Sequence, residues 1–332
     1  MPMLSCDEHY FHPADENKLS IIIEEQFGIT EAHVSLLTRE GSDRTYYRIK
    51  NERVSLVMMV YGREKDENDY YVHIQQFLAS IPINVPKILY SDAKKRWIFL
   101  EDLGETHLHT VVKSSQTDLF LLYRQVIDKI SPLYTTGYEN FYKKPFITAP
   151  PFDQSLYQWE HNYFIENFLQ RYKHADTSYS DLSGELSKHA QILSGYSNKL
   201  VHRDLQSKNC MIYNNDIYFI DFQGLRPGLP EYDLASLLYD PYVFLHENMR
   251  NELADYFYTI SRKGNSECRA EFLFRYNLCA AQRLMQALGA YGYLGLVKQK
   301  PQFIQYIEPA EQLLASVLRT NKILPSVLKL LG

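Results

Sequence analysis

The spacing of hydrophobic residues changes along the chain and divides it into a strand-rich first third and a helical remainder. Residues 18–27 carry apolar side chains on one helical face, and residues 64–79 predict a charged helix. Around these helices, short apolar runs bounded by Gly, Pro, Asn and Asp are typical of strands. The predicted strands cover residues 33–38, 45–50, 55–61, 86–90 and 96–100.

From residue 106 onward the pattern is helical, with one short interruption. Strands predicted at 210–213 and 217–220 are joined by an Asn-Asn-Asp turn, whose residues tolerate the positive φ angles of a tight hairpin. The sequence therefore predicts an α+β fold with two lobes. Residues 1–104 would form a small nucleotide-binding lobe with an antiparallel sheet, and residues 105–332 a larger helical lobe with the catalytic loop and the substrate pocket. The helices predicted in the larger lobe cover residues 118–133, 152–171, 179–193 and most of 232–331.

The strongest chemical signal is the run HRDLQSKN at residues 202–209, followed by Asp221 seventeen residues after Asp204. Phosphoryl transfer needs a carboxylate beside the acceptor hydroxyl, and it needs oxygen ligands for the magnesium ions that bridge the β- and γ-phosphates. A lone His-Arg-Asp recurs by chance. Here it coincides with Asn209, a predicted hairpin and Asp221 at the spacing of a kinase active site.

This motif predicts a role for each of its polar residues. We expect Asp204 to receive the proton of the acceptor, and Asn209 and Asp221 to hold Mg²⁺. His202 and Arg203 are expected to be structural and to fix the loop. The side chains at 204, 209 and 221 should then converge at the floor of a crevice between the lobes.

Nucleotide contacts are predicted from the order of the elements along the chain. The polar loop before strand 45–50 lies where a kinase covers the phosphates of ATP, so Ser42 and Arg44 are expected to contact the nucleotide. Glu101 and Leu103 fall where the hinge between the lobes would pair with adenine.

Kinases usually place a lysine on the third strand to grip the α- and β-phosphates. Residues 55–61 contain no basic residue. Arg44, Arg48, Lys65 and Lys208 are therefore candidates for the missing phosphate contact.

Composition narrows the class of protein. The net charge is −5 and no basic stripe is visible, which argues against a nucleic-acid partner. No apolar run has the length that spans a membrane, and the first residues do not read as a secretory signal. Four cysteines without a Cys-x-x-Cys pair predict free, buried thiols in a reducing cytosol. We therefore expect a cytoplasmic enzyme with a small-molecule partner, and the oligomeric state stays open.

Several segments together resemble the aminoglycoside phosphotransferase superfamily, and within it the bacterial anomeric amino-sugar kinases. The resemblance runs from about residue 30 to residue 310, in the order of that family. The segments that carry it are LEDLG (100–104), HRDLQSKN (202–209), IDFQ (220–223), PEYDLASLL (230–238) and QRLMQALG (282–289).

The resemblance implies a protein-kinase-like fold and an enzyme that uses ATP and Mg²⁺. Its acceptor would be N-acetylmuramate or N-acetylglucosamine, phosphorylated at the C1 hydroxyl during cell-wall recycling. It also implies that Asp233 anchors the catalytic loop, and that the helix at 152–171 lines the substrate pocket, with Glu160 as a candidate contact.

Three other functions fit parts of this sequence pattern. A protein kinase is disfavoured because only ten residues separate Asp221 from Tyr232, too few for a peptide-docking activation segment, and Gln206 replaces the usual lysine. Aminoglycoside, choline or homoserine kinases stay open, since their acceptors cannot be read from the motif. A nucleotide-binding pseudokinase is suggested by the missing lysine, but the filled positions at 204, 209 and 221 argue against it.

Overall fold

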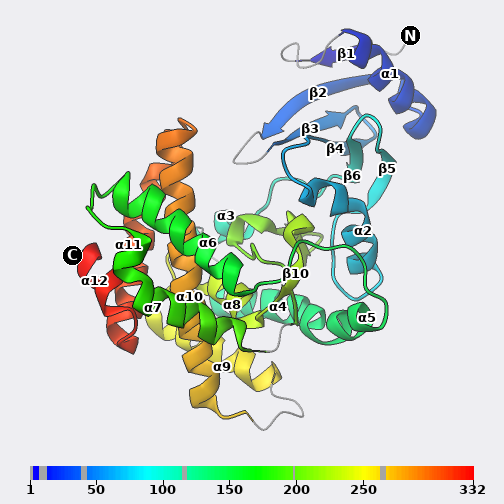
Figure 1. Ribbon diagram of the computed structural model, residues 1–332. Coiled ribbons are helices and arrows are strands. Elements are labelled where there is room, and N and C mark those ends of the chain that lie inside the picture. Colours follow the sequence, from blue (N-terminus) through cyan, green and yellow to red (C-terminus); the bar gives the residue numbers. More distant parts are fainter. Residues whose placement is uncertain (1–2, 7–12, 39–42, 114–117, 197–198, 262–266) are drawn as a thin grey trace.

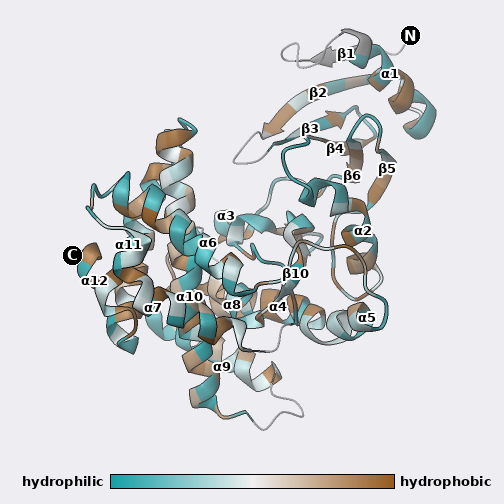
Figure 2. Cartoon of the chain, in the orientation of Figure 1, coloured by the Kyte–Doolittle hydropathy of each residue, from teal (hydrophilic) through white to brown (hydrophobic). Residues whose placement is uncertain are grey.

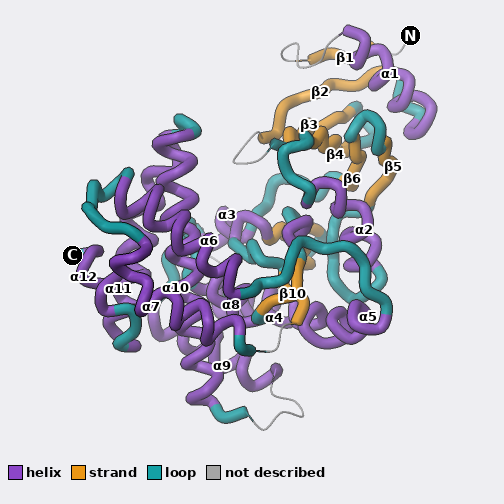
Figure 3. Tube along the Cα trace, in the orientation of Figure 1, coloured by secondary structure: helices purple, strands orange, loops and turns teal. Residues whose placement is uncertain are grey.

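The computed structural model describes residues 3–6, 13–38, 43–113, 118–196, 199–261 and 267–332. Strands gather at one end of the molecule and helices fill the other, so the chain has the two-lobed α+β architecture that the sequence predicts (Figures 1 and 3).

The small lobe is built on a six-stranded sheet with the order β1-β2-β3-β4-β6-β5. All neighbouring strands are antiparallel except β1, which runs parallel to β2 and was not predicted from the sequence. The strands are β1 Met3–Cys6, β2 Glu31–Thr38, β3 Arg44–Lys50, β4 Ser55–Tyr61, β5 Ile88–Asp92 and β6 Trp97–Glu101.

The middle of strand β4 is buried on both faces of the sheet. Met58 packs with helix α1 (Pro13–Phe27) on one side of the sheet. Met59 belongs to the core on the other side, which includes helix α2 (Glu67–Ala79), and neither methionine is exposed. Successive residues of a strand point to opposite faces, so the apolar run in the middle of β4 packs against both layers.

The larger lobe is a group of helices around α10, which packs against α6, α8 and α11. Helices α6, α7 and α10 alternate between hydrophobic and hydrophilic colour along their surfaces, as expected of helices with one buried face (Figure 2). The helices are α3 Leu108–Val112, α4 Leu119–Pro132, α5 Tyr138–Lys143, α6 Gln154–Phe164, α7 Tyr179–Ser194, α8 Pro230–Leu238, α9 Glu247–Ser261, α10 Arg269–Gly292, α11 Ile307–Asn321 and α12 Pro325–Leu331.

Two small antiparallel ladders flank the 202–209 motif. Strands β8 (Cys210–Tyr213) and β9 (Asp216–Phe219) form the predicted hairpin, with Asn214 and Asn215 at φ angles of 50° and 60°. The sequence pattern missed the other ladder, in which β7 (Lys199–Val201) pairs with β10 (Arg226–Gly228).

The cysteine prediction is partly wrong. Cys210 and Cys279 are buried free thiols, but Cys268 is exposed because it lies at the start of α10 rather than inside the lobe. Within the ranges given above, no helix combines the length and the apolar character needed to cross a bilayer.

The predicted helix at 152–171 is divided into α6 and a π-helical turn, Ile165–Gln170. This turn brings the Asn167 carbonyl oxygen so close to Gly292 of α10 that a Cβ atom there would lie 2.2 Å from it. A side chain at 292 would therefore push the two elements apart.

We expect Gly292→Ala to destabilise the protein by about 1–3 kcal/mol, the usual cost of overpacking. Gly184→Ala is the matched control, since it lies on α7 with no atom within 4 Å of its added Cβ. That control should be neutral or slightly stabilising because alanine is the better helix former. Urea unfolding of both variants measures the difference, and equal free energies of unfolding would contradict the close approach.

Candidate active site

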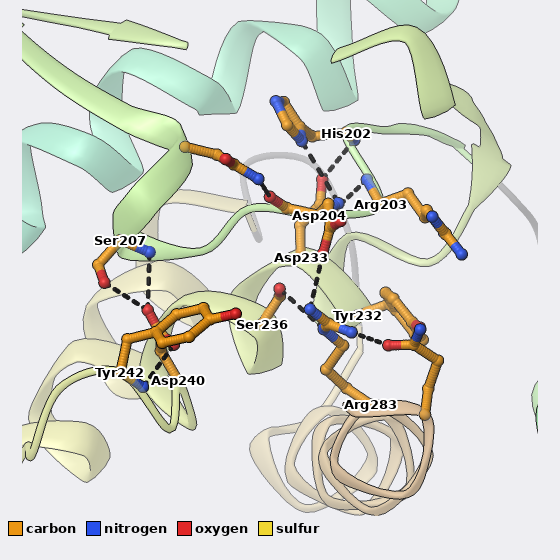
Figure 4. Close-up of polar contacts among 12 residues, drawn as sticks. His202, Arg203, Asp204, Ser207, Tyr232, Asp233, Ser236, Asp240, Tyr242 and Arg283 are labelled. Atoms are coloured by element: carbon orange, nitrogen blue, oxygen red, sulfur yellow. Dashed lines mark hydrogen bonds and ion pairs between the residues drawn. The ribbon is translucent and has the colours of Figure 1, made fainter. Parts of the chain in front are cut away.

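The 202–209 loop is held by one buried carboxylate. Asp233, in the first turn of α8, accepts hydrogen bonds from the backbone N–H groups of His202 (2.7 Å) and Arg203 (2.8 Å), as Figure 4 shows. Tyr134 donates a third hydrogen bond at 3.2 Å. Burial raises the pKa of Asp233, whereas these three donors oppose that rise. The loop therefore leaves β7 in a conformation fixed by α8.

Asp204 lies beside Arg283 of α10. Their side chains form an ion pair of 2.7 Å, and Arg283 also donates to Ser236 at 3.0 Å and to Gln286 (Figure 4). The Asp204 side chain is 30% exposed whereas that of Arg283 is 7% exposed, so the arginine holds the carboxylate from its buried side. This pairing uses Oδ1 of Asp204.

Hydrogen bonds link Asp204 to Asn209, and Asn209 to the residue that precedes Asp221. The Asn209 side chain donates to the Asp204 carbonyl oxygen at 2.9 Å. The N–H of Ile220 donates to the Asn209 carbonyl oxygen at 3.0 Å, and the next residue, Asp221, has a φ angle of 62° that turns the chain. The Asp221 side chain is 32% exposed, similar to Asp204, so both carboxylates remain accessible.

Asp221 is paired across the two lobes. The Arg44 guanidinium lies 3.0 Å from its Oδ1, and Gln223 donates to the same oxygen at 3.1 Å. Burial raises the pKa of Asp221, but Arg44 and Gln223 outweigh this effect and hold the pKa below its ordinary value. Arg44 is thus a basic residue of the small lobe that reaches this site and pairs directly with Asp221.

Arg48 does not lie near Asp221. It forms two hydrogen bonds with Asp102, of 2.8 and 3.1 Å, and donates to the Gly104 carbonyl oxygen at 3.0 Å. It therefore braces the segment between the lobes instead of facing a phosphate. In the same segment, the Glu101 side chain is 21% exposed and Leu103 is buried.

Lys208 and Ser42 also differ from expectation. The Lys208 ammonium lies over the ring of Tyr242, 4.1 Å from its centroid, and 5.3 Å from that of Tyr306. This cation–π contact directs it toward the aromatic side chains of the helical lobe. Ser42 lies outside the described residues.

Glu160, the candidate substrate contact, lies in the core of the helical lobe. Its side chain is 1% exposed and accepts a hydrogen bond from Gln282 of α10 at 2.9 Å. Burial raises its pKa. Gln282 also contacts His161 at 2.7 Å, and His161 contacts His189 at 3.2 Å, so α6, α7 and α10 share one buried polar network.

A model of the phosphotransferase enzyme family, APH, matches residues 33–265, which is more than half of the chain. The chain belongs to this family. It is a phosphotransferase that acts on a hydroxyl group of a small molecule.

Two kinds of relative are similar to this phosphotransferase. An N-acetylmuramate/N-acetylglucosamine kinase from Pseudomonas aeruginosa is 24% identical over 293 residues, which is 82% of this chain and 81% of the relative. Among solved structures, a Plasmodium vivax ethanolamine kinase has a TM-score of 0.65 at 12% identity, covering 95% of this chain and 93% of that one. An ADP-bound aminoglycoside phosphotransferase, APH(2'')-Ib, has a TM-score of 0.58 at 15% identity, covering 92% and 99%. The protein-kinase-like fold is therefore confirmed.

Sequence reasoning missed two residues that position the loop of this phosphotransferase. Arg283 lies in the family-like segment 282–289, but nothing in that segment indicated a contact with Asp204. Asp240 accepts hydrogen bonds from the N–H and the hydroxyl of Ser207, at 2.7 and 2.5 Å. Both contacts join segments that are distant in sequence, so local spacing could not reveal them.

The buried histidines His161 and His189 predict that acid lowers the stability of the folded protein. Burial lowers the pKa of His161 to about 3 and that of His189 to about 4, against an ordinary value near 6.5. Both are neutral in the folded protein, whereas the unfolded chain takes up protons below pH 6.5. The contribution of the neutral histidines to the free energy of unfolding is therefore fully present above pH 6.5. It is lost as the pH falls, by roughly 2 kcal/mol per histidine at pH 5.

Urea unfolding from pH 7.5 to 5 should show this loss. His189→Gln should flatten the curve, whereas His73→Gln, at an exposed position of α2, should leave it unchanged. A wild-type free energy of unfolding that does not fall below pH 6.5 would contradict the analysis.

Proposed function

We propose that this phosphotransferase transfers the γ-phosphoryl group of ATP to the anomeric hydroxyl of a cell-wall amino sugar, N-acetylmuramate or N-acetylglucosamine. The observation that carries the proposal is the pair of hydrogen bonds that joins Asp204 to Asn209 and Asn209 to Ile220, the neighbour of Asp221, because phosphoryl transfer needs a carboxylate and oxygen ligands of this kind close together. The name of the Pseudomonas aeruginosa relative supports the choice of acceptor.

In this proposal Asp204 orients the acceptor. Arg283 binds Oδ1, which leaves Oδ2 for the hydroxyl group. The proton passes from that hydroxyl to Asp204 as the bond to the γ-phosphorus forms and the bond to the β–γ bridging oxygen breaks. Arg283 acts as a positioning residue, because it keeps the carboxylate in the geometry that an in-line transfer requires.

The site fits a magnesium ion by its donor set. Asn209 uses its side-chain nitrogen toward Asp204, so its amide oxygen can face a metal together with the Asp221 carboxylate. Oxygen ligands of this kind, completed by phosphate oxygens and water, are what Mg²⁺ prefers. When bound, the ion would neutralise charge on the transferred phosphoryl group.

The nucleotide would lie between residues 1–104 and 105–332, as the two-lobed arrangement suggests. Arg44 is the proposed substitute for the missing strand lysine because it already contacts Asp221, whereas Arg48 and Lys208 are committed elsewhere. The hinge residues Glu101 and Leu103 would pair with adenine through their backbone groups. The role of Ser42 stays a prediction.

A cationic acceptor such as an aminoglycoside or choline is the competing proposal. The solved relatives of those classes support it through the shared fold. Against it, Arg203 and Arg283 flank Asp204, and Arg226 lies close enough to Arg203 for their charges to interact. Arg283 is paired with Asp204 and Arg226 with Glu67, so repulsion of a positively charged acceptor would come mainly from Arg203.

A screen of ATP consumption tests the acceptor. N-acetylmuramate, N-acetylglucosamine, glucose, choline and kanamycin are compared at equal concentration, and phosphorus NMR identifies the product. Turnover of an amino sugar to a C1 phosphate is expected. Turnover of kanamycin or choline alone would refute the sugar assignment.

Asp204→Ala should lower kcat for the sugar by about 10²–10⁴-fold, the usual contribution of a general base. ATP binding, measured by calorimetry, should persist because the nucleotide ligands are unchanged. Asp255→Asn, in an exposed ion pair with Arg269, is the control and should keep wild-type turnover. Unchanged turnover in Asp204→Ala would exclude it as the base.

Arg44→Gln should raise KM for ATP by roughly 10-fold or more, because a charge-assisted contact to phosphate is lost. KM for the sugar should change little. Arg53→Gln, at an exposed position of the small lobe, is the matched control. An unchanged KM for ATP in Arg44→Gln would assign the phosphate contact to another residue.

A further inference from the structure

Arg203 adopts a backbone conformation that favours glycine. Its φ angle is 77°, in the left-handed region where a Cβ atom is crowded by the backbone. Asp233 holds this conformation through the Arg203 N–H group, a contact that any residue other than proline could make. A large side chain at this position carries a conformational cost, which suggests that the side chain has a function.

The guanidinium of Arg203 has no hydrogen-bonded or ion-paired partner among the residues that the structure describes, although the residue is only partly exposed. In Figure 4 its side chain extends away from Asp233 and Arg283 without a contact to the other residues drawn. Withdrawing a charge from water is costly unless a partner compensates it.

The acidic groups near Arg203 are committed to other donors. Burial opposes ionisation of Arg203, but Asp204, Glu67 and Glu160 act on it and raise its pKa. Their closest partners lie elsewhere: Asp204 binds Arg283 at 2.7 Å, Glu67 binds Arg226 at 2.6 Å, and Glu160 binds Gln282 at 2.9 Å. Arg203 therefore remains available to form an ion pair with a further anion.

Arg203 directly precedes Asp204 in the loop, and its Cδ atom lies 3.4 Å from the position that a Cβ atom would take on Gly224. Its charge also acts on Tyr163 of α6, in the helical lobe, where it opposes the rise in pKa that burial causes.

Tyr163 is part of an aromatic surface that suits a sugar ring. Its ring stacks on that of Trp159, with centroids 5.2 Å apart and an interplanar angle of 11°, and lies 5.8 Å from that of Tyr293. Trp159 is 52% exposed, so the stack offers an open apolar face. Ligand sites commonly combine such aromatic faces with a few charged groups that fix orientation.

We propose that Arg203 binds a carboxylate substituent of the acceptor, and that it thereby selects acidic over neutral sugars. Arginine is suited to this task because its planar fork can bind both carboxylate oxygens. The inference rests on the proposed function for its acceptor. N-acetylmuramate carries a lactyl carboxylate that N-acetylglucosamine lacks, so the two sugars form a natural pair of probes.

The test measures kcat/KM of the full chain for N-acetylmuramate, its uncharged methyl ester and N-acetylglucosamine. Arg203→Gln should lower kcat/KM for N-acetylmuramate by about 30-fold or more, as for loss of a charged partner. The values for the two uncharged sugars should change by less than about threefold. For Arg203→Lys, kcat/KM for N-acetylmuramate should lie between the values of wild type and Arg203→Gln, since lysine keeps the charge but lacks the planar fork of arginine. Arg319→Gln, exposed on α11, is the matched control.

Arg203→Gly separates recognition from folding. Glycine suits the φ angle at this position, so this variant should unfold at no lower a temperature than wild type while losing the preference for the acid. An equal loss of kcat/KM for charged and uncharged sugars would overturn the inference and assign Arg203 to phosphate binding. A clear fall in the unfolding temperature of Arg203→Gly would assign it to the fold instead.

A second measurement distinguishes failure of the amino-sugar assignment from failure of the inference on Arg203. Thermal shift is recorded with matched acidic and neutral probes, galacturonate with galactose and glycerate with glycerol, in wild type and Arg203→Gln. Stabilisation of wild type alone by an acidic probe would support Arg203 even if no amino sugar is turned over. If no acidic compound, including N-acetylmuramate, is turned over or stabilises the wild type, the inference on Arg203 is refuted.

Discussion

The Asp233 carboxylate is the contact on which the geometry of the site depends. It binds two successive backbone N–H groups, those of His202 and Arg203, and so determines how the chain leaves β7. Without these hydrogen bonds the positive φ angle of Arg203 would be unfavourable and Asp204 would not be directed toward Arg283. A buried carboxylate with three donors is stable only when all of them stay in place, so α8 and the loop are coupled.

Charge pairs across the molecule position the remaining polar residues. Asp221 is paired with Arg44 of the small lobe, and Arg226 of the helical lobe is paired with Glu67 of α2. Each pair joins one lobe to the other, and the paired atoms are largely shielded from water on the arginine side. Nucleotide phosphates would compete with Asp221 for Arg44, so binding would rearrange an existing contact between the lobes rather than create a new one.

The sequence predicted the elements that depend on neighbouring residues, but not the contacts between residues that are distant along the chain. Strand β4 and the β8–β9 hairpin follow from local hydrophobic spacing and turn residues, which act within a few positions. The β7–β10 ladder was missed because each strand has three residues, too few to show a period. Arg48, a candidate phosphate contact, instead pairs with Asp102, which the sequence pattern could not indicate because it lies 54 positions away.

By itself, the sequence determined the two-lobed fold and the family, and it pointed to Asp204, Asn209 and Asp221 as the proposed site, because these depend on short motifs and local periodicity. Only the tertiary structure decided which basic residue accompanies each carboxylate. Arg283 meets Asp204 and Arg44 meets Asp221 through helix packing and lobe contact, while Glu160 is withdrawn into the core by Gln282. Long side chains reach their partners through space, so their roles depend on burial and distance rather than on spacing along the chain.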